Sequence, residues 1–268
     1  GSGIEIPNNA VVYDLKGKYI YPSFIELRSN YGMPDIPKKK SALKPQYISK
    51  NNGSAYWNDA IHPQLQSVEM FAENVKQSEK LRALGFGVVL THQYNGIMRG
   101  NAAVVSLGKN IYWKAILNPN GAAYYGFGRG NSSQLYPTSL MGSIALFRQA
   151  KYDANWYAGS NKLPVNYALE AIEQNIEIPQ FFDARNYQAV LRAAKLGDEF
   201  EMSFVATGGG DAYKRIEEIK ESNVKLVLPL NFPKPFDVSD PLDAQYISLN
   251  DLKHWELVPS IPAVVSDS

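Results

Sequence analysis

The sequence predicts an α/β fold built around a largely parallel β-sheet. From residue 165 onwards, short apolar stretches alternate with helical patterns of roughly ten residues, which is typical of parallel βαβ units. Two earlier apolar runs, residues 86–90 and 102–107, are typical of buried strands. Between residues 136 and 157, a Pro-Thr-Ser start precedes apolar residues at helical spacing. Together these patterns predict an α/β domain.

Each predicted element follows from its apolar period and from the residues at its ends. Helices are placed where apolar residues recur every three or four positions and where Gly85 or Gly197 supplies a stop. Strands are placed where apolar residues alternate or run together between turn residues such as Asn95 and Gly96. The predicted strands are residues 10–14, 86–90, 102–107, 111–117, 178–182, 201–206 and 224–230; the predicted helices are 67–84, 136–157, 165–172, 187–196, 212–220 and 249–256. Residues 118–133, dense in Gly, Asn and Tyr, are predicted to form a loop.

Composition excludes several classes of function. The 268 residues carry 27 basic and 26 acidic side chains, a net charge of +1, which gives no support for nucleic acid or an acidic membrane surface as a partner. The run 38–40 of three lysines is too short to change this and is expected to be a solvated loop. The absence of cysteine excludes disulfides, thiolate metal sites and a cysteine nucleophile. No apolar run approaches the ~20 residues of a membrane span. Residues 1–3 (Gly-Ser-Gly) are typical of a cloning remnant, so the position of the natural N-terminus is not defined by this sequence.

The segment 16–32, KGKYIYPSFIELRSNYG, carries the first sign of a known family. It contains a turn at Gly17, a strand, Pro22 and a second strand that ends in polar residues. This order resembles the start of the barrel in the amidohydrolase superfamily, especially its imidazolonepropionase-like branch. The segments 57–64, 85–108, 136–157 and 208–229 resemble the same branch.

The resemblance implies a TIM-like (β/α) amidohydrolase barrel. Residues 1–18 would be a tag and a remnant of the family's N-terminal β-sandwich, and residues 19–268 a partial metal-dependent-hydrolase-like barrel with insertions at 33–66 and 109–135. A complete barrel needs about 250 residues without insertions. Because this chain carries two long insertions and about six barrel-type strands at most, we expect the barrel to be incomplete, with its remainder outside the chain.

The positions that hold metal in the resembled family are occupied here by other residue types. In the family the first strand reads roughly D-x-x-G-K-x-x-x-P-G-F-I-D-x-H-x-H, and its two histidines are metal ligands. Arg28 and Asn30 stand at these positions, Asp183 stands where a later histidine is found, and Thr207 or Gly208 replaces the next one. The resemblance therefore implies a lost metal site with no cofactor expected, whereas members with an intact site use zinc.

His92 and Asp183 are the candidate catalytic residues. Of the three histidines, only His92 falls at the end of a predicted barrel strand, whereas His62 precedes Pro63 and His254 lies in the last predicted helix. His92 can be a general base near neutral pH or a half-buried side chain bonded to a neighbouring loop. Asp183 can be a metal ligand, or it can make a structural hydrogen bond or serve as a helix N-cap.

Arg28, Asn30, Thr207 and Gly208 are the candidate ligand-binding residues. A guanidinium at position 28 can replace the lost metal charge and hold Glu26, Asp183 or an anionic ligand. The glycines from Gly208 to Gly210 can form an anion cradle of backbone N–H groups or a tight turn between a strand and a helix.

Three functional hypotheses remain open. The first is an amidohydrolase-like domain, by ancestry a hydrolase of C–N bonds other than peptide bonds, acting as a non-catalytic scaffold or ligand-binding half. Here the chain resembles the N-terminal half of large exported bacterial proteins, so the partner would be a second amidohydrolase-like half of the same polypeptide and the compartment the periplasm. The second is an active amidohydrolase around His92 and Asp183, completed by residues outside the chain. The third is a carbohydrate or peptide binding module that uses Tyr124, Tyr125 and Phe127 with Arg129.

Overall fold

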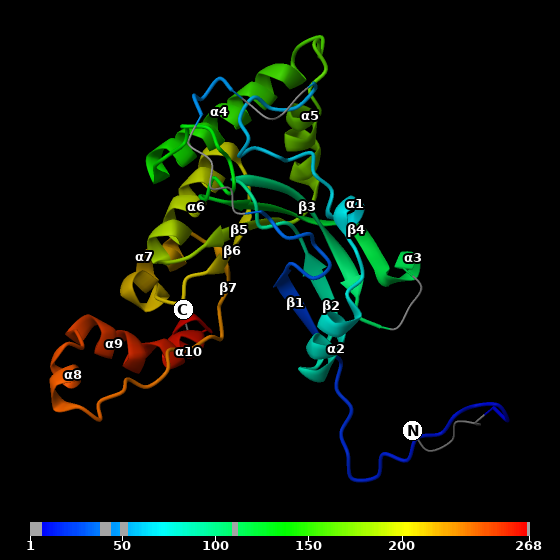
Figure 1. Ribbon diagram of the computed structural model, residues 1–268, viewed down its shortest axis with the longest axis vertical. Helices are drawn as coiled ribbons and strands as arrows, with labels where there is room; N and C mark the ends of the chain where they lie inside the picture. The colour runs from blue at the N-terminus through cyan, green and yellow to red at the C-terminus, as the bar shows by residue number, and fades with distance from the viewer. Residues whose placement is uncertain (1–6, 38–43, 49–52, 109–111, 267–268) are drawn as a thin grey trace.

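A seven-stranded sheet forms the centre of the protein. The computed structural model describes residues 7–37, 44–48, 53–108 and 112–266. Strands follow one another in space in chain order, and only β3 runs against its neighbours; the other adjacent pairs are parallel. The sheet curls into an open half-barrel (Figure 1). Its strands are β1 (Phe24–Ser29), β2 (Phe86–Thr91), β3 (Met98–Ser106), β4 (Ile116–Gly126), β5 (Gln180–Ala184), β6 (Phe204–Gly208) and β7 (Lys225–Val227).

Helices cover the outer face of this sheet and extend the chain beyond it. The longest, α4, begins after Ser139, whose side chain accepts a hydrogen bond from the Gly142 N–H, and Asn186 caps α6 in the same way. The helices are α1 (Ser67–Met70), α2 (Val75–Ala83), α3 (Tyr112–Ala115), α4 (Leu140–Ala158), α5 (Tyr167–Gln174), α6 (Tyr187–Phe200), α7 (Ile216–Glu221), α8 (Pro241–Gln245), α9 (Leu249–Leu257) and α10 (Ile261–Ser266). Among the described residues, none of these helices is long and apolar enough to cross a membrane.

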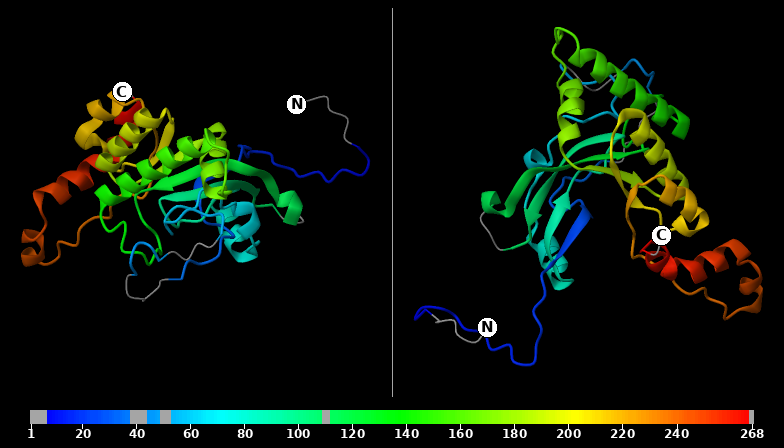
Figure 2. Two further views of the ribbon diagram at one scale, coloured as in Figure 1. Left: turned by 90° about the horizontal axis from the view of Figure 1, so that it is seen from above. Right: turned by 180° about the vertical axis from the view of Figure 1, so that it is seen from behind.

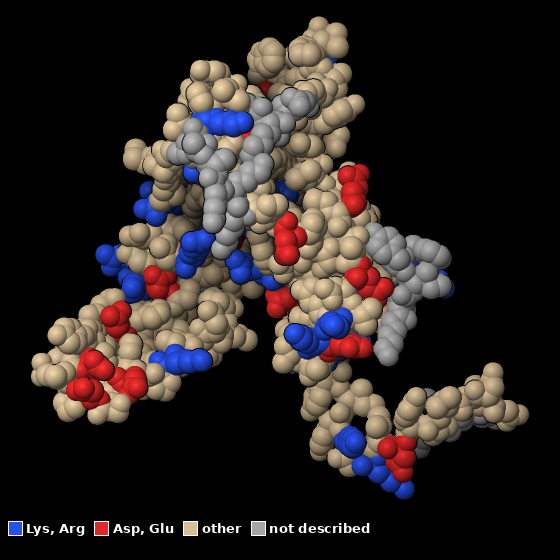
Figure 3. Space-filling view, in the orientation of Figure 1, with Lys and Arg blue, Asp and Glu red and all other residues tan. Residues whose placement is uncertain are grey.

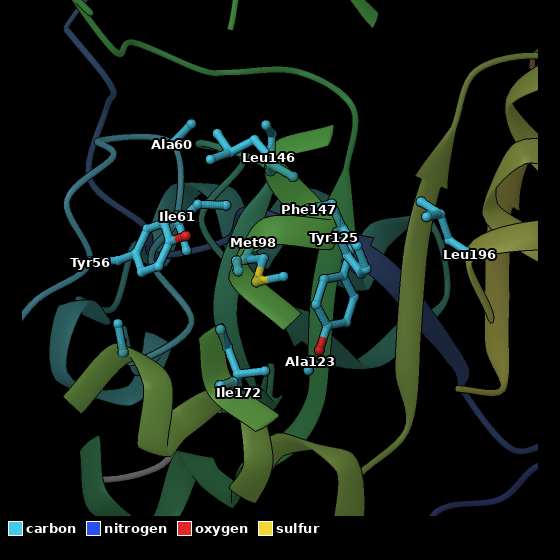
Figure 4. Close-up of a cluster of buried hydrophobic side chains, with 14 of the residues drawn as sticks. Tyr56, Ala60, Ile61, Met98, Ala123, Tyr125, Leu146, Phe147, Ile172 and Leu196 are labelled. Carbon is cyan, nitrogen blue, oxygen red and sulfur yellow. The ribbon is translucent and has the colours of Figure 1, made fainter. Parts of the chain in front are cut away.

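Alternate side chains of the central strands enter two separate cores. On β4, Tyr125 packs against Phe147 of α4 in the outer core (Figure 4). Its neighbour Tyr124 belongs to a second cluster with Leu90 and Phe181, here called the inner core. On β5, Phe182 and Phe181 divide between the same two cores. Because both faces of these strands are buried, successive residues are apolar and the sequence shows continuous apolar runs.

The order of β5, α6, β6, α7 and β7 confirms the parallel sheet predicted for the second half of the chain. The ends of several helices differ from the predicted ones. Helix α6 continues through Gly197 and ends at Phe200, where the C-cap residue Glu201 adopts the left-handed conformation with φ 55°. The segment predicted as one helix over 67–84 breaks at Phe71, whose backbone is extended, and restarts after Asn74, whose side chain caps α2.

The prediction for residues 111–133 was wrong. A short helix, α3, stands where a strand was expected, and β4 runs through the first part of the expected loop. Glycine and asparagine indicated a loop, but pairing with β3 and β5 on both sides supplies the backbone hydrogen bonds of an eleven-residue strand. Local propensity is overridden here by the sheet. Ile111, where the strand was expected to begin, lies outside the described residues, as do the Gly1–Gly3 remnant and the Lys38–Lys40 run.

The predicted strand over residues 10–14 is also absent from the structure. Residues 7–22, here called the N-terminal arm, extend away from the body in every view (Figure 2) and contain no strand. A single strand without a neighbour has no partner for its backbone groups, so its alternating pattern alone does not stabilise it. A β-sandwich remnant is therefore not seen in the described part of residues 1–18.

Acidic and basic side chains are interspersed on the face seen in Figure 3. This agrees with the near-zero net charge of the chain.

Candidate functional site

The candidate site lies at the edge of the sheet where the parallel strands end. Arg28 is near the end of β1, His92 follows β2, and Asp183 and Thr207 are the penultimate residues of β5 and β6. Because β3 is antiparallel, it begins at this same edge and brings Arg99 into the group. In α/β sheets this edge is where binding and catalytic residues collect.

An irregularity in β1 directs Arg28 towards this edge. Leu27 packs in the inner core, so strict alternation would turn its neighbour Arg28 outwards. The pairing of β1 with β2 shifts register between Glu26 and Ser29. A bulge of this kind changes the direction of a side chain, and here it brings Arg28 towards the end of β5.

Two arginines hold one carboxylate at this edge. Arg28 Nη2 donates to both oxygens of Asp183, at 3.2 Å to Oδ1 and 3.4 Å to Oδ2. On the other side, Nη1 and Nη2 of Arg99 each donate to Oδ2 at 3.2 Å. We call these three residues the Arg–Asp–Arg cluster. Its formal charge is +1, and hydrogen bonds of this charged kind are stronger than neutral ones.

Arg99 is the buried member of the cluster and is fixed from several sides. Its side chain is 7% exposed, against 48% for Arg28. Nε donates to the Gly96 carbonyl at 3.1 Å, and a side chain at Gly126 would lie 2.4 Å from Nη2, so glycine is needed there. Burial lowers the pKa of Arg99 and the charge of Asp183 opposes this change. The guanidinium therefore stays protonated and depends on Asp183 for its countercharge.

His92 is completely buried beside the cluster. Its ring stacks on Tyr124 at 3.5 Å between centroids and meets Tyr94 edge-on at 4.4 Å. Within the described residues, neither ring nitrogen has a hydrogen-bond partner. Burial, followed by the charges of Arg99 and Arg28, holds the pKa of His92 well below its ordinary value. The ring is thus neutral at pH 7, and the expectation of a half-buried histidine bonded to a loop was wrong.

Two tyrosines complete the wall around His92. Arg28 lies over the ring of Tyr94, 5.1 Å from its centroid, in a cation–π contact. Burial raises the pKa of Tyr94 to about 12 and also raises that of Tyr124, so both phenols are neutral. The hydroxyl of Tyr124 donates to the carbonyl of Leu27, which ties β4 to β1 across the concave face.

A hollow of about 880 Å³ opens next to the cluster, between β1 and β7. Its polar lining includes Arg28, Asp183, Arg185 and Thr207, and the rest of its lining is largely apolar. Volumes of this size are typical of small-molecule sites.

The residues at this edge do not fit a metal centre of the family type. A guanidinium has no free lone pair for a metal ion, and both oxygens of Asp183 already accept hydrogen bonds from arginine. Within residues 7–37, 44–48, 53–108 and 112–266, no three His, Asp or Glu side chains gather as a metal-binding group. The ligand-type residues near this edge, His92, Asp183 and Glu26, do not form such a group among the described residues, whereas a catalytic zinc site normally brings three ligands together.

Several other predicted residues lie elsewhere or act differently. Asn30 is exposed, and its carbonyl accepts a turn hydrogen bond from the Met33 N–H. Thr207 is buried and its hydroxyl donates to the Phe182 carbonyl at 3.4 Å. Asp183 is not the N-cap of α6, because Asn186 accepts that hydrogen bond.

The glycine-rich segment after β6 forms a tight turn. Gly208 has φ 130°, and a Cβ at this position would lie 1.8 Å from the Ala184 carbonyl oxygen. The Gly209 N–H donates to that same carbonyl, so this amide is not available to an anion. The prediction of a turn is confirmed.

The tyrosine-rich segment does not line a cleft as expected. Tyr124 and Tyr125 are 1% and 4% exposed and belong to the two cores. Phe127 packs against the outer core, and Arg129 donates to the carbonyls of Gln134 and Pro137. These side chains are therefore structural. His62 and His254 also lie outside the cluster. His62 is partly buried, and His254 is on α9 with Nδ1 3.2 Å from the Tyr213 hydroxyl.

Sequence reasoning missed Arg99 and Tyr94. Arg99 precedes Gly100, whose φ is 82°, in a segment predicted only as a connection between two strands. The available signal was an arginine beside a positive-φ glycine at the start of an apolar strand. This signal places Arg99 at the site only if β3 is antiparallel, because only then does the start of β3 lie at the edge where the parallel strands end.

Comparison with known proteins finds a solved structure with a similar fold. No family model and no characterised protein matches the chain. Among solved structures, the chain is similar to an amidohydrolase from Thermotoga maritima MSB8, with a TM-score of 0.66 and 20% sequence identity. The similarity covers 96% of this chain and 68% of the Thermotoga chain. At 20% sequence identity, this similarity is evidence for a shared fold alone.

Proposed function

We propose that this chain is an amidohydrolase-type barrel segment in which the Arg–Asp–Arg cluster has replaced the metal centre. It acts as a non-catalytic scaffold or ligand-binding half. By ancestry it belongs with hydrolases of C–N bonds other than peptide bonds, and the imidazolonepropionase-like branch is the one that its motifs resemble.

The single observation that carries this proposal is the pairing of Arg28 and Arg99 with Asp183. Arg28 stands at a motif position for a metal-binding histidine, and Asp183 stands at another. A metal ion at such a place supplies positive charge to the ends of the strands. The two guanidinium groups supply positive charge at the same edge and satisfy the carboxylate that would otherwise need a metal or a proton.

Ligand binding is supported by the hollow beside the cluster. Arg28 is half-exposed there, and the hydrogen bonds described for its side chain use Nη2 alone, which leaves Nε and Nη1 for an anionic ligand.

The scaffold role rests on the family resemblance. In large exported bacterial proteins with two amidohydrolase-like halves, a degenerate half would support a catalytic one. The proposed partner is therefore a second amidohydrolase-like half of the same polypeptide, in the periplasm. The greater length of the Thermotoga chain is in line with a partial barrel.

Elemental analysis tests the proposal. The chain is expressed in zinc-supplemented medium, purified without chelators and analysed for metal per chain, beside Asp183→Asn and a control, Glu199→Gln, which alters an exposed carboxylate. We expect all three proteins to hold well below one zinc ion per chain. One zinc ion per chain in the parent and control, lost in Asp183→Asn, would refute the proposal. The active alternative would gain support if hydrolysis of an amide or cyclic imide stopped in His92→Ala.

A further inference from the structure

A second, smaller pocket lies beyond the ends of β5, β6 and β7. Its volume is about 370 Å³, at the lower end of the range for small-molecule sites. The residues that line it come from the loops after these three strands and from α9 and the turn that follows it: segments 185–186, 210–214, 229–233 and 250–258. The pocket is thus enclosed between strand ends and a helix, whereas the hollow lies between β1 and β7. Arg185, Pro229 and Asn231 border both.

The packing of α9 holds this pocket in shape. Val258 and Ile261, which follow α9, are 5% and 2% exposed in a core cluster shared with residues of α6 and β6. On α9 itself, His254 Nδ1 lies 3.2 Å from the hydroxyl of Tyr213, in the segment after β6. A preformed pocket loses little conformational entropy when a ligand binds.

Four charged side chains line the pocket, two of each sign, and only one pair of them is joined. Lys214 Nζ lies 3.8 Å from Asp211 Oδ2, so these two charges offset each other. Within the described residues, the guanidinium of Arg185 has neither an ion pair nor a hydrogen bond. Asp251 accepts a hydrogen bond from the neutral hydroxyl of Ser248 at 2.6 Å, and in the same part of the chain it has no cationic partner. The pocket therefore presents one unpaired positive charge and one unpaired negative charge.

These two charges stand on different walls. Arg185 follows β5, whereas Asp251 is on α9, and they do not form an ion pair with each other. A ligand with one charge of each sign can satisfy both. A simple anion would bind Arg185 but meet the like charge of Asp251, and a simple cation would meet that of Arg185, so both kinds of ligand are disfavoured.

We infer that this pocket binds a small zwitterion, a free amino acid, with its carboxylate on Arg185 and its ammonium group on Asp251. The guanidinium presents a planar pair of donors that matches a carboxylate, and the carboxylate of Asp251 accepts from an ammonium group. Asn231 and Asn250 also line the pocket, and their amides can donate to and accept from a polar side chain of the ligand. The inference does not rest on the proposed function, because Asp251 lines this pocket and not the hollow.

A thermal-shift screen with each of the common L-amino acids at about 10 mM, followed by calorimetric titration of the tightest binder, tests this inference. We expect a polar amino acid to bind with one molecule per chain. Arg185→Gln and Asp251→Asn should each weaken binding by about ten- to a hundredfold, because each removes a charged hydrogen-bond partner. Lys195→Gln and Asp198→Asn are the matched controls, since both residues are exposed on α6 outside the pocket. They should leave binding unchanged.

Capped ligands give a second test on the unaltered chain, which does not depend on the folding of any variant. The N-acetyl derivative of the bound amino acid lacks the ammonium charge and its amide derivative lacks the carboxylate, so each should bind at least about tenfold more weakly. An N-acetyl derivative that binds as tightly as the amino acid would overturn the inference, because the pocket would then take an anion. A screen in which no amino acid binds would overturn it as well. Binding that is lost in Arg185→Gln but kept in Asp251→Asn would place the ligand in the hollow and also overturn it.

Discussion

Replacing Asp183 by asparagine should strongly destabilise the fold, because it leaves a buried guanidinium without its countercharge. Arg99 is 7% exposed and depends on Asp183, which is itself 14% exposed. Removing one partner of a buried ion pair typically costs about 3 to 5 kcal/mol. The loss of the second contact, with Arg28, adds less than about 1 kcal/mol, because Arg28 is half in solvent. We expect Asp183→Asn to lower the free energy of unfolding by about 3 kcal/mol or more.

Urea unfolding followed by tryptophan fluorescence measures this free energy. A double-mutant cycle with Arg99→Gln separates the pair from its surroundings, and we expect a coupling of about 1 to 3 kcal/mol, with the double variant less damaged than the sum of the single ones. Glu199→Gln is the control, since it breaks an exposed pair with Arg148 and should cost less than about 1 kcal/mol. The reasoning is refuted if Asp183→Asn unfolds like the parent, or if the two single changes are additive.

Three further predictions concern the site and its support. The buried His92 has a lowered pKa, so below about pH 6.5 the unfolded chain binds a proton at this residue and the folded chain does not; stability should therefore fall by up to about 1.4 kcal/mol per pH unit as the pH decreases. His92→Phe keeps the stacking on Tyr124 and should reduce the slope of stability against pH in the acid range. An unchanged slope would contradict this prediction. Gly126→Ala places a methyl group 2.4 Å from Arg99 Nη2, so a loss of about 1 to 3 kcal/mol in thermal unfolding is expected, and a neutral result would mean that Arg99 is free to move. Asn186→Ala removes the cap of α6 and should cost about 1 kcal/mol in the same assay, while Asn186→Asp, which keeps an acceptor, should be close to neutral; equal losses would argue against capping.

The fold was predictable where sequence pattern and sheet agree. Strands β2 and β5 and helices α4 and α9 lie close to their predicted ranges, because their apolar periods and end signals are local. β4 was not predicted, since its glycine and asparagine residues are held in a strand by the neighbours on both sides. The strand expected in residues 10–14 failed for the converse reason, because its pattern has no neighbour to pair with in a single molecule.

The site was predictable only in part. The family resemblance singled out Arg28 and Asp183 as candidate site residues, and in the structure their side chains form an ion pair at 3.2 Å. Arg99 could not be found in this way, because its position at the same edge depends on the reversed direction of β3. The burial of His92 also depends on β4, whose Tyr124 covers the imidazole.

The sequence by itself determined the α/β class, the parallel second half and the absence of histidines where the resembled family binds metal, because these features are carried by local patterns and by residue types. Tertiary structure alone decided which charged residues meet at this edge. Opposite charges 155 residues apart meet only when β1 and β5 end at one edge, and a bulge in β1 and a reversed β3 then bring two guanidinium groups to one carboxylate. Contacts of this kind depend on strand direction and register, which are properties of the assembled sheet.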